Sequence, residues 1–183
     1  MSLSEEERKA IVAYRIEKAR LVMNEILIGT AINSGAASIP WRTLTDGEWT
    51  YLLSERANAT NLLGMATINV DASTSVHGLV LLPDTWTAIS TVPFAPRGSV
   101  NANQLALSQW ETMEANGAVF LPAAGNRNGT TLASTGVNGN YWTATNEGAD
   151  KAYYMGFATA TVSANRSGNR YLGRAVRLVQ NAD

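Results

Sequence analysis

Apolar residues near the start of the chain recur at spacings of three and four, which places them on one side of a helix. Ser4 and Glu7 precede this run in the pattern of a capping box. We therefore predict an amphipathic helix over residues 1–29, followed by a small and polar linker over residues 30–40. The apolar side of such a helix must be buried. Two alternatives remain open: it packs on its own domain, or it joins copies of the chain into a homo-oligomer.

Two shorter helices are expected farther along the chain. Thr45 and Glu48 have the spacing of a second capping box, and apolar residues at helical spacing follow, so a helix is predicted over about residues 46–57. Ser108 and Glu111 have the same spacing and predict the start of a third, short helix.

Apolar and β-branched runs predict strands between and after these helices. The expected strands are residues 66–70, 76–82, 118–121, 152–157 and 173–179. Val80, Leu81 and Leu82 form a continuous apolar run, which is typical of a strand that is buried on both faces.

Three polar stretches separate the later apolar segments, and we interpret them as loops: residues 125–140, 143–151 and 163–171. Asn, Ser, Thr, Gly, Arg and Tyr dominate them, and several of these residue types suit adaptable contacts. Loops held by a rigid scaffold are where recognition usually occurs. The sequence therefore predicts a ligand-binding surface composed of Asn126, Asn128, Asn138, Asn140, Thr145, Asn146, Asp150, Tyr153, Tyr154, Asn165, Arg166, Asn169, Arg170 and Tyr171.

Composition restricts the chemistry that this surface supports. The formal net charge is −1, from 14 basic and 15 acidic residues, so no global field attracts nucleic acid. Cysteine is absent and His77 is the one histidine, which excludes a thiolate nucleophile and a Cys- or His-ligated zinc site. No Asp-x-Asp-x-Asp calcium loop is present. We expect no metal, no cofactor and no enzymatic activity.

A hydrolase with paired carboxylates is an alternative. Its candidates are Asp46, Glu48, Asp84, Glu111 and Glu114. Most of these residues are expected at helix starts, where a carboxylate stabilises the exposed amides. No apolar run approaches the about 20 residues that span a bilayer, so we expect no direct membrane insertion. The polar, acidic start is unlike a secretory signal, and the location stays open, with a cell surface or a virion suspected.

Five motifs, in order, resemble a bacterial and phage family with a C-type-lectin-like fold: residues 41–49, 77–86, 117–125, 139–145 and 174–179. That family includes the Fibrobacter major paralogous domain and the variable proteins of diversity-generating retroelements. The resemblance covers about residues 41–179. It implies an α+β, C-type-lectin-like domain at residues 41–183, with short antiparallel sheets, two short helices and long irregular loops, after the N-terminal helix.

The resemblance also implies a function. In the retroelement proteins, adenine-directed mutagenesis rewrites codons in the C-terminal segment, with asparagine codons as frequent targets. The scattered Asn residues of this chain are similar, so the implied function is receptor recognition or adhesion through a diversifiable surface. The implied partner is a protein or glycan on another cell or particle. The active cysteines of formylglycine-generating enzymes and the calcium motifs of sugar-binding C-type lectins are missing here. The alternative is a non-variable structural or adhesive component of a bacterial cell surface or phage particle.

The C-terminal segment is also expected to divide into core and surface positions. The residues expected in the core are Trp142, Val176 and Leu178. The residues expected to be largely exposed are Asn140, Asn169 and Tyr171. One contiguous exposed surface is expected to hold Asn140, Thr145, Asn146, either Tyr153 or Tyr154, Arg166, Asn169, Arg170 and Tyr171.

Overall fold

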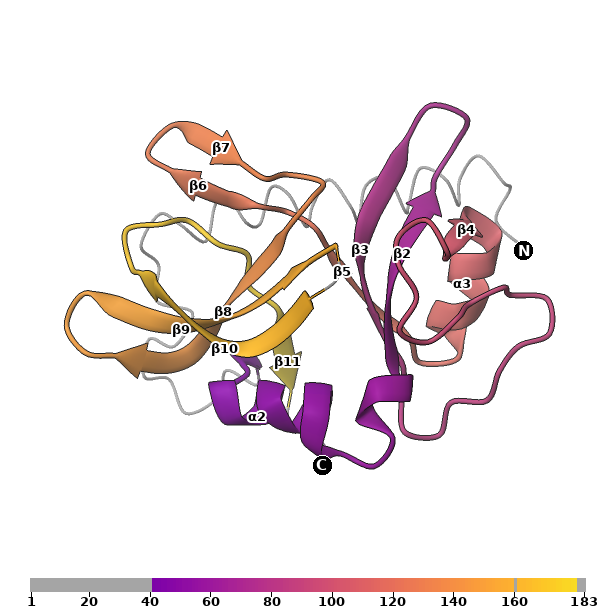
Figure 1. Ribbon diagram of the computed structural model, residues 1–183, viewed down its shortest axis with the longest axis horizontal. Helices are drawn as coiled ribbons and strands as arrows, with labels where there is room; N and C mark the ends of the chain where they lie inside the picture. Colours follow the sequence, from indigo (N-terminus) through magenta and orange to yellow (C-terminus); the bar gives the residue numbers. More distant parts are fainter. Residues whose placement is uncertain (1–40, 160, 181–183) are drawn as a thin grey trace.

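The computed structural model describes residues 41–159 and 161–180 (Figure 1). The helix expected at residues 1–29, the linker at 30–40 and oligomerisation through that helix lie outside the described residues. Among the described residues, no helix is long and apolar enough to cross a membrane.

The described part of the chain is mostly β, with 43 % strand and 16 % helix. Its strands are β1 (Trp41–Thr43), β2 (Leu63–Asn69), β3 (Ser75–Leu81), β4 (Gln104–Ala106), β5 (Val119–Pro122), β6 (Asn126–Asn128), β7 (Thr131–Ala133), β8 (Gly139–Glu147), β9 (Lys151–Ala158), β10 (Thr161–Asn169) and β11 (Leu178–Gln180). Its helical segments are α2 (Asp46–Thr50), the π-helix η1 (Tyr51–Glu55), the 3-10 helix η2 (Ala59–Asn61) and α3 (Leu107–Ala115). The prediction of an α+β, C-type-lectin-like fold is therefore wrong, because only two short α-helices accompany these strands.

A four-stranded sheet in the order β4-β2-β3-β5 divides the interior into two cores. Strand β3 pairs with β2 and with β5 in antiparallel fashion, whereas β4 is parallel to β2. Side chains alternate along β3, so Val80 enters one core while Leu79 and Leu81 enter the other. The prediction that the apolar run at 80–82 is buried on both faces is confirmed.

The first core lies between this sheet and α3. Trp110 and Met113 of α3 pack with Ile68 and Val80 of the sheet, and the rings of Trp110 and Phe120 lie 5.5 Å apart. The third capping box was misplaced, because α3 begins at Leu107 and Ala106 is its N-cap residue. An alanine has no side-chain oxygen to cap the helix. The helix therefore uses one reciprocal bond, from the Ala106 amide to Oε1 of Gln109 at 2.9 Å.

The second core joins the other face of the four-stranded sheet to a three-stranded antiparallel sheet, β10-β9-β8. Trp49 of α2 packs there with Leu79, Leu121, Met155 and Phe157. Helix α2 thus covers one face of the three-stranded sheet (Figure 1).

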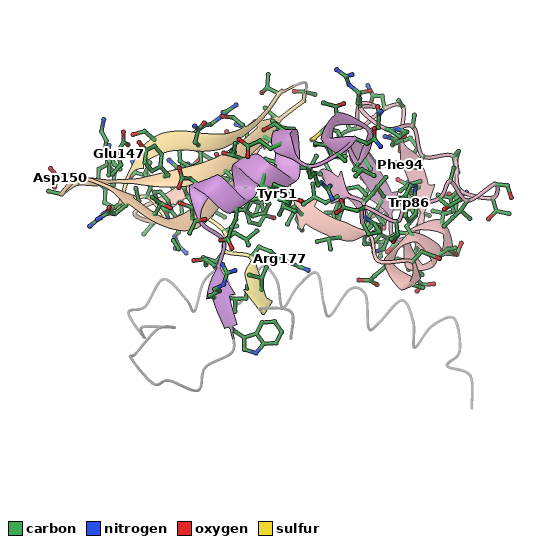
Figure 2. All side chains as sticks on the ribbon, turned by 90° about the horizontal axis from the view of Figure 1, so that it is seen from below. Tyr51, Trp86, Phe94, Glu147, Asp150 and Arg177 are labelled. Carbon is green, nitrogen blue, oxygen red and sulfur yellow. The ribbon has the colours of Figure 1, made fainter. Side chains whose placement is uncertain are left out.

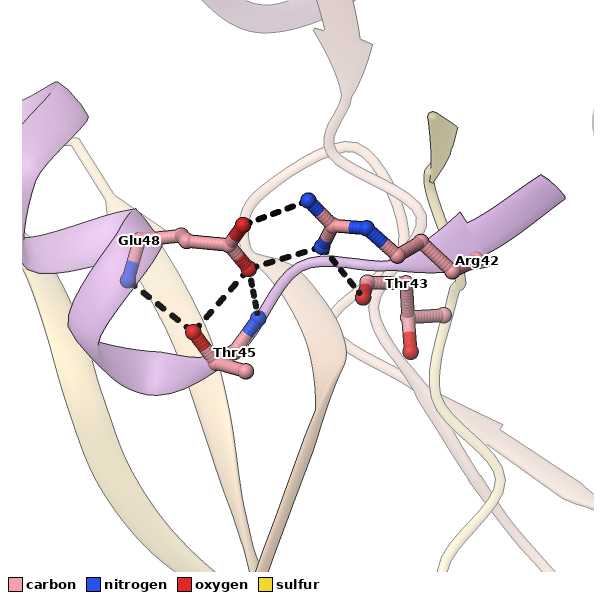
Figure 3. Close-up of polar contacts among 4 residues, drawn as sticks. All are labelled: Arg42, Thr43, Thr45 and Glu48. Atoms are coloured by element: carbon pink, nitrogen blue, oxygen red, sulfur yellow. Dashed lines mark hydrogen bonds and ion pairs between the residues drawn. The ribbon is translucent and has the colours of Figure 1, made fainter. Parts of the chain in front are cut away.

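The capping box predicted at the start of α2 is present (Figure 3). The Glu48 amide donates to Thr45 Oγ1 at 3.1 Å, and the Thr45 amide donates to Glu48 Oε2 at 2.8 Å. Arg42 adds two hydrogen bonds to the same carboxylate, at 2.8 and 2.6 Å. These hydrogen bonds stabilise the ionised carboxylate, and the bond from Arg42 has the largest effect. They lower the pKa of Glu48 to about 2. The pair fixes β1 to the helix that follows it.

Much of the three stretches predicted as loops is strand. Residues 139–147 and 161–169 form β8 and β10, and residues 126–133 form the β6-β7 hairpin. Their polar composition hid them because one face of the three-stranded sheet meets no apolar layer among the described residues, so apolar residues need not alternate there. The hydrogen bonds between strands are made by backbone amide and carbonyl groups, so a strand with polar side chains can form them as well.

The strand expected at residues 173–179 is also largely wrong. Only Leu178–Gln180 forms a strand, β11, which pairs with β1. Residues 173 and 175 make isolated bridges to Arg127 and Tyr141 instead. Val176 and Leu178 are accordingly half-buried and do not belong to either core.

Candidate functional site

The two faces of the three-stranded sheet differ in what meets them. Tyr141, Met155 and Phe157 point into the second core. The alternate side chains point away from it, and Trp142, Tyr154 and Arg166 lie opposite one another across the three strands. We call this second side the outer face and define it by Trp142, Asn146, Ala152, Tyr154, Gly156, Arg166 and Gly168. The described helices do not cover it, because α2 packs on the inner face and α3 packs on the four-stranded sheet.

Arg174 reaches onto the outer face from the segment beside β8. The Ala175 amide donates to the Asn140 carbonyl at 2.9 Å, and the Trp142 amide donates to the Ala175 carbonyl at 2.9 Å, so this segment is fixed at the edge of the sheet. The guanidinium carbon of Arg174 lies 3.6 Å from the Tyr154 ring centroid and 4.8 Å from that of Trp142. The two rings meet edge to face, with centroids 5.9 Å apart. Arg174 therefore makes cation–π contacts with both rings.

Two glycines form the floor beneath this cluster. A Cβ atom on Gly168 would collide with Nη2 of Arg174 and would lie 3.0 Å from the Tyr154 ring. A Cβ atom on Gly156 would lie 3.0 Å from Cδ of Arg166 and 3.1 Å from the same ring. The absence of side chains at both positions lets the Tyr154 ring and the two arginines lie close to the backbone.

Arg174 is a buried cation, with 8 % of its surface exposed. Burial lowers the pKa of Arg174 from its ordinary value, because the charged form has lost water. Among the described residues, its Nε atom has no hydrogen-bond partner and its guanidinium group forms no ion pair.

Arg56 is a buried arginine of the same molecule that has several hydrogen-bond partners and a carboxylate. It is 7 % exposed, and its guanidinium donates to the carbonyls of Leu52, Leu62 and Leu82 and to the carboxylate of Asp84. These bonds connect η1 to residues that directly flank β2 and β3 of the four-stranded sheet. Arg174 has aromatic rings and glycines around it instead.

Charge is distributed unevenly along the described chain. Residues 41–116 contain seven acidic and three basic residues, whereas residues 117–180 contain two acidic and six basic residues. The two acidic residues of the later segment, Glu147 and Asp150, lie at the β8-β9 end of the sheet (Figure 2). The outer face itself has Arg166 and the overlying Arg174 and no carboxylate.

Several residues predicted for the binding surface belong to the outer face or to its end. Tyr154, Arg166 and Asn146 are part of the outer face as defined. Asn169 and Tyr171 lie where β10 ends and are joined by a hydrogen bond of 3.1 Å. Beside them, Arg170 donates from Nε to the Lys151 carbonyl at 3.0 Å, and the exposed Asp150 lies in the adjoining turn.

Other predicted residues lie elsewhere, so the expectation of one contiguous face is wrong for the full set. Asn140, expected to be exposed, is buried, with only 7 % of its surface exposed. Its side-chain amide donates to the Gly125 carbonyl at 3.2 Å. Thr145 donates to the Asp46 carboxylate at 2.7 Å, which directs it toward α2. Of the two tyrosines offered as alternatives, Tyr154 lies on the outer face and Tyr153 lies on the opposite side of β9, as alternation along a strand requires.

The remaining predicted asparagines lie on neighbouring segments. Asn126 and Asn128 belong to β6, whose central residue Arg127 bridges to Gly173. Asn138 lies just before β8, and the exposed Asn165 lies at the irregularity in the β9-β10 pairing.

Sequence reasoning missed the centre of the site. Trp142 was expected in the core, but it is half-buried on the outer face. The sequence pattern places Arg174 in a strand and predicts no role for it. The available signal was Gly156 and Gly168, since a glycine within a strand often marks a close approach by another group.

The described residues contain no group of three or more His, Cys, Asp or Glu side chains that could hold a metal ion.

Comparison with known families gives one match. A family described as a domain of unknown function (DUF8237) matches residues 84–179, just over half of the chain. The matched segment includes every residue of the outer face as well as Arg174. No curated protein and no solved structure matches the chain.

Proposed function

We propose that this chain, which belongs to the family described as a domain of unknown function (DUF8237), is a ligand-binding protein that contacts its partner through the outer face. The observation that carries the proposal is the cluster of Trp142, Tyr154 and Arg174 on a sheet face that the described helices leave uncovered. Recognition or adhesion, and not catalysis, is the activity that such a face supports.

The composition of the cluster supports a binding role. Tryptophan, tyrosine and arginine are the side chains that contribute most often to binding hot spots. Here the two rings are held by their edge-to-face contact, by the Arg174 guanidinium over them and by the close approach to Gly156 and Gly168. A partner that meets pre-ordered side chains loses less conformational entropy on binding.

Polar residues surround this cluster and complete the surface. Asn146 is exposed at one end, and Tyr171 is 71 % exposed beside Asn169. A partly buried aromatic centre with a polar, hydrated rim is the common anatomy of a protein interface.

The resemblance to retroelement variable proteins adds a narrower proposal: that the C-terminal strands are a diversified surface. Exposed positions such as Asn128, Asn146 and Asn165 support it, because substitutions there remove no buried side chain. Sequencing the surrounding locus tests it. A reverse transcriptase gene and a near-copy of the 3′ coding segment are expected, and a locus without them would favour a non-variable binding protein.

A displayed library tests the binding function itself. It randomises five positions on or beside the outer face: Asn146, Arg166, Asn169, Arg170 and Tyr171. A control library randomises five exposed positions in the loop after β3: Thr85, Thr87, Ala88, Ser90 and Thr91.

Selection against unrelated target proteins should yield binders from the first library and few from the second. The melting temperatures of the selected variants should match that of the parent, because the changed side chains lie outside both cores. Equal yields from the two libraries would show that the outer face has no special aptitude for binding. A first library that is mostly unfolded would assign these residues to the stability of the fold.

A further inference from the structure

Arg174 lacks a negatively charged partner within the described protein. A buried cation is costly unless it is paired and hydrogen-bonded. The two rings beside Arg174 supply cation–π attraction, but a cation–π contact replaces only part of the hydration of a guanidinium group. The described fold thus holds a desolvated positive charge that a carboxylate from outside would complement.

Arg166 lies next to this buried charge and provides the accessible donors. Its Cδ packs against Gly156, close to the Tyr154 ring that Arg174 covers. One hydrogen bond is recorded for its guanidinium, from Nη2 to Thr161 Oγ1 at 3.3 Å. A guanidinium group has five N–H donors, so a half-exposed Arg166 retains donors for a ligand.

Both arginines attract an anion that approaches the outer face. The charge of Arg174 is surrounded by rings and backbone and not by water, so it is screened less than an exposed charge. Arg166 presents the planar donor geometry that matches a carboxylate group. No acidic residue on the outer face competes for either of them.

We propose that the outer face binds an acidic segment of a partner protein, with Arg166 as the direct donor to an Asp or Glu carboxylate and Arg174 as the buried counter-charge. This inference rests on the proposed binding function and specifies the chemistry of the partner.

The geometry favours a peptide over other anionic partners. Stacking of a sugar or a nucleic-acid base needs a free aromatic face, and here one face of the Tyr154 ring is covered by the Arg174 guanidinium at 3.6 Å. A single-stranded nucleic acid also needs a continuous basic track, whereas the outer face as defined has one arginine on its strands.

A synthetic array of random twelve-residue peptides, probed with the full-length chain, tests this proposal. Asp and Glu should be enriched among the bound peptides relative to the array. The tightest peptide is then measured in solution beside a version in which every Asp and Glu is replaced by Asn and Gln. The neutral version should bind at least about tenfold more weakly, since it leaves the arginine without a carboxylate.

Two variants remove the same charge from different places. Arg166→Gln should weaken binding of the acidic peptide at least about tenfold. Arg177→Gln is the matched control, because Arg177 is exposed beside β11 (Figure 2) and is not a residue of the outer face. Its loss should change the affinity less than about twofold. The melting temperature of each variant verifies that the fold is kept.

The results distinguish a failure of the acidic-peptide inference from a failure of the proposed binding function. Equal binding of the acidic and neutral peptides, or equal losses in the two variants, would overturn the inference. Tighter binding of a single-stranded oligothymidine than of any acidic peptide would overturn it in favour of nucleic acid. An array without acidic enrichment would also overturn it, while binders from the outer-face library would leave the proposed binding function in place.

Discussion

Replacing each of the two buried arginines by methionine should have opposite effects on stability. Methionine keeps a long, flexible apolar chain and removes the charge together with its donors. Arg56 and Arg174 have nearly equal exposure, 7 % and 8 %, so the two substitutions differ in the partners that are lost and not in the degree of burial.

At Arg56 the substitution removes bonds from a charged donor to three carbonyl groups and one carboxylate. Hydrogen bonds to charged groups contribute about 1.5–3 kcal/mol each. The substitution also removes the cost of burying the charge, which offsets part of this loss. The free energy of unfolding should still fall by about 3 kcal/mol or more.

At Arg174 the substitution removes two cation–π contacts of about 1 kcal/mol each. It also removes a buried, unpaired charge whose desolvation costs several kcal/mol. The two effects nearly cancel or leave a gain, so the free energy of unfolding should be unchanged or should rise by about 1 kcal/mol. The same variant should lose affinity for acidic peptides.

Urea denaturation of the full chain and both variants measures these changes, with the slope of the transition checked for constancy. A loss of about 2 kcal/mol or more at Arg174 would refute the reasoning, because it would show that the cluster serves the fold.

Two further predictions follow from other contacts. Since the pKa of Glu48 is lowered from 4.5 to about 2, this carboxylate stabilises the fold above pH 4.5, and that contribution should disappear as the pH falls toward 2. Glu48→Gln should remove about 1 kcal/mol of this pH dependence in acid titrations followed by circular dichroism, since both partners are more than one-third exposed. Asn103 is fully buried and bonds to the Met65 carbonyl and to both backbone groups of Ala95. Asn103→Ala should cost about 3 kcal/mol in urea, and a cost below about 1 kcal/mol would contradict that account.

The elements that sequence reasoning predicted correctly depend on local chemistry. The capping box of Thr45 and Glu48 lies within one turn of helix, and the apolar run at 80–82 records burial on both sides of one strand. Patterns of this kind are complete within a few residues, so they need no knowledge of distant partners.

The elements that it missed depend on partners far along the chain. Strands β8 and β10 have polar residues or glycine at several positions on the outer face, and residues such as Asn146 and Gly168 resemble loop residues. Arg174 meets Tyr154 and Gly168 only after the chain has turned back on the sheet, and spacing along the sequence does not reveal that meeting. Asn140 shows the opposite error: a residue type common in loops is buried by its bond to the Gly125 carbonyl.

The five tryptophans allow a direct test of the binding face, because they report on different parts of the molecule. Trp142 lies on the outer face, Trp49 and Trp110 lie in the two cores, Trp41 is exposed on β1, and Trp86 lies in the loop after β3. The measurement is the set of indole N–H signals in a nitrogen-15 NMR spectrum while the tightest array peptide, acidic or not, is added to the full chain. The outer-face proposal predicts that the Trp142 signal shifts first and farthest. A Trp142 signal that stays fixed while that of Trp41 or Trp86 moves would contradict it.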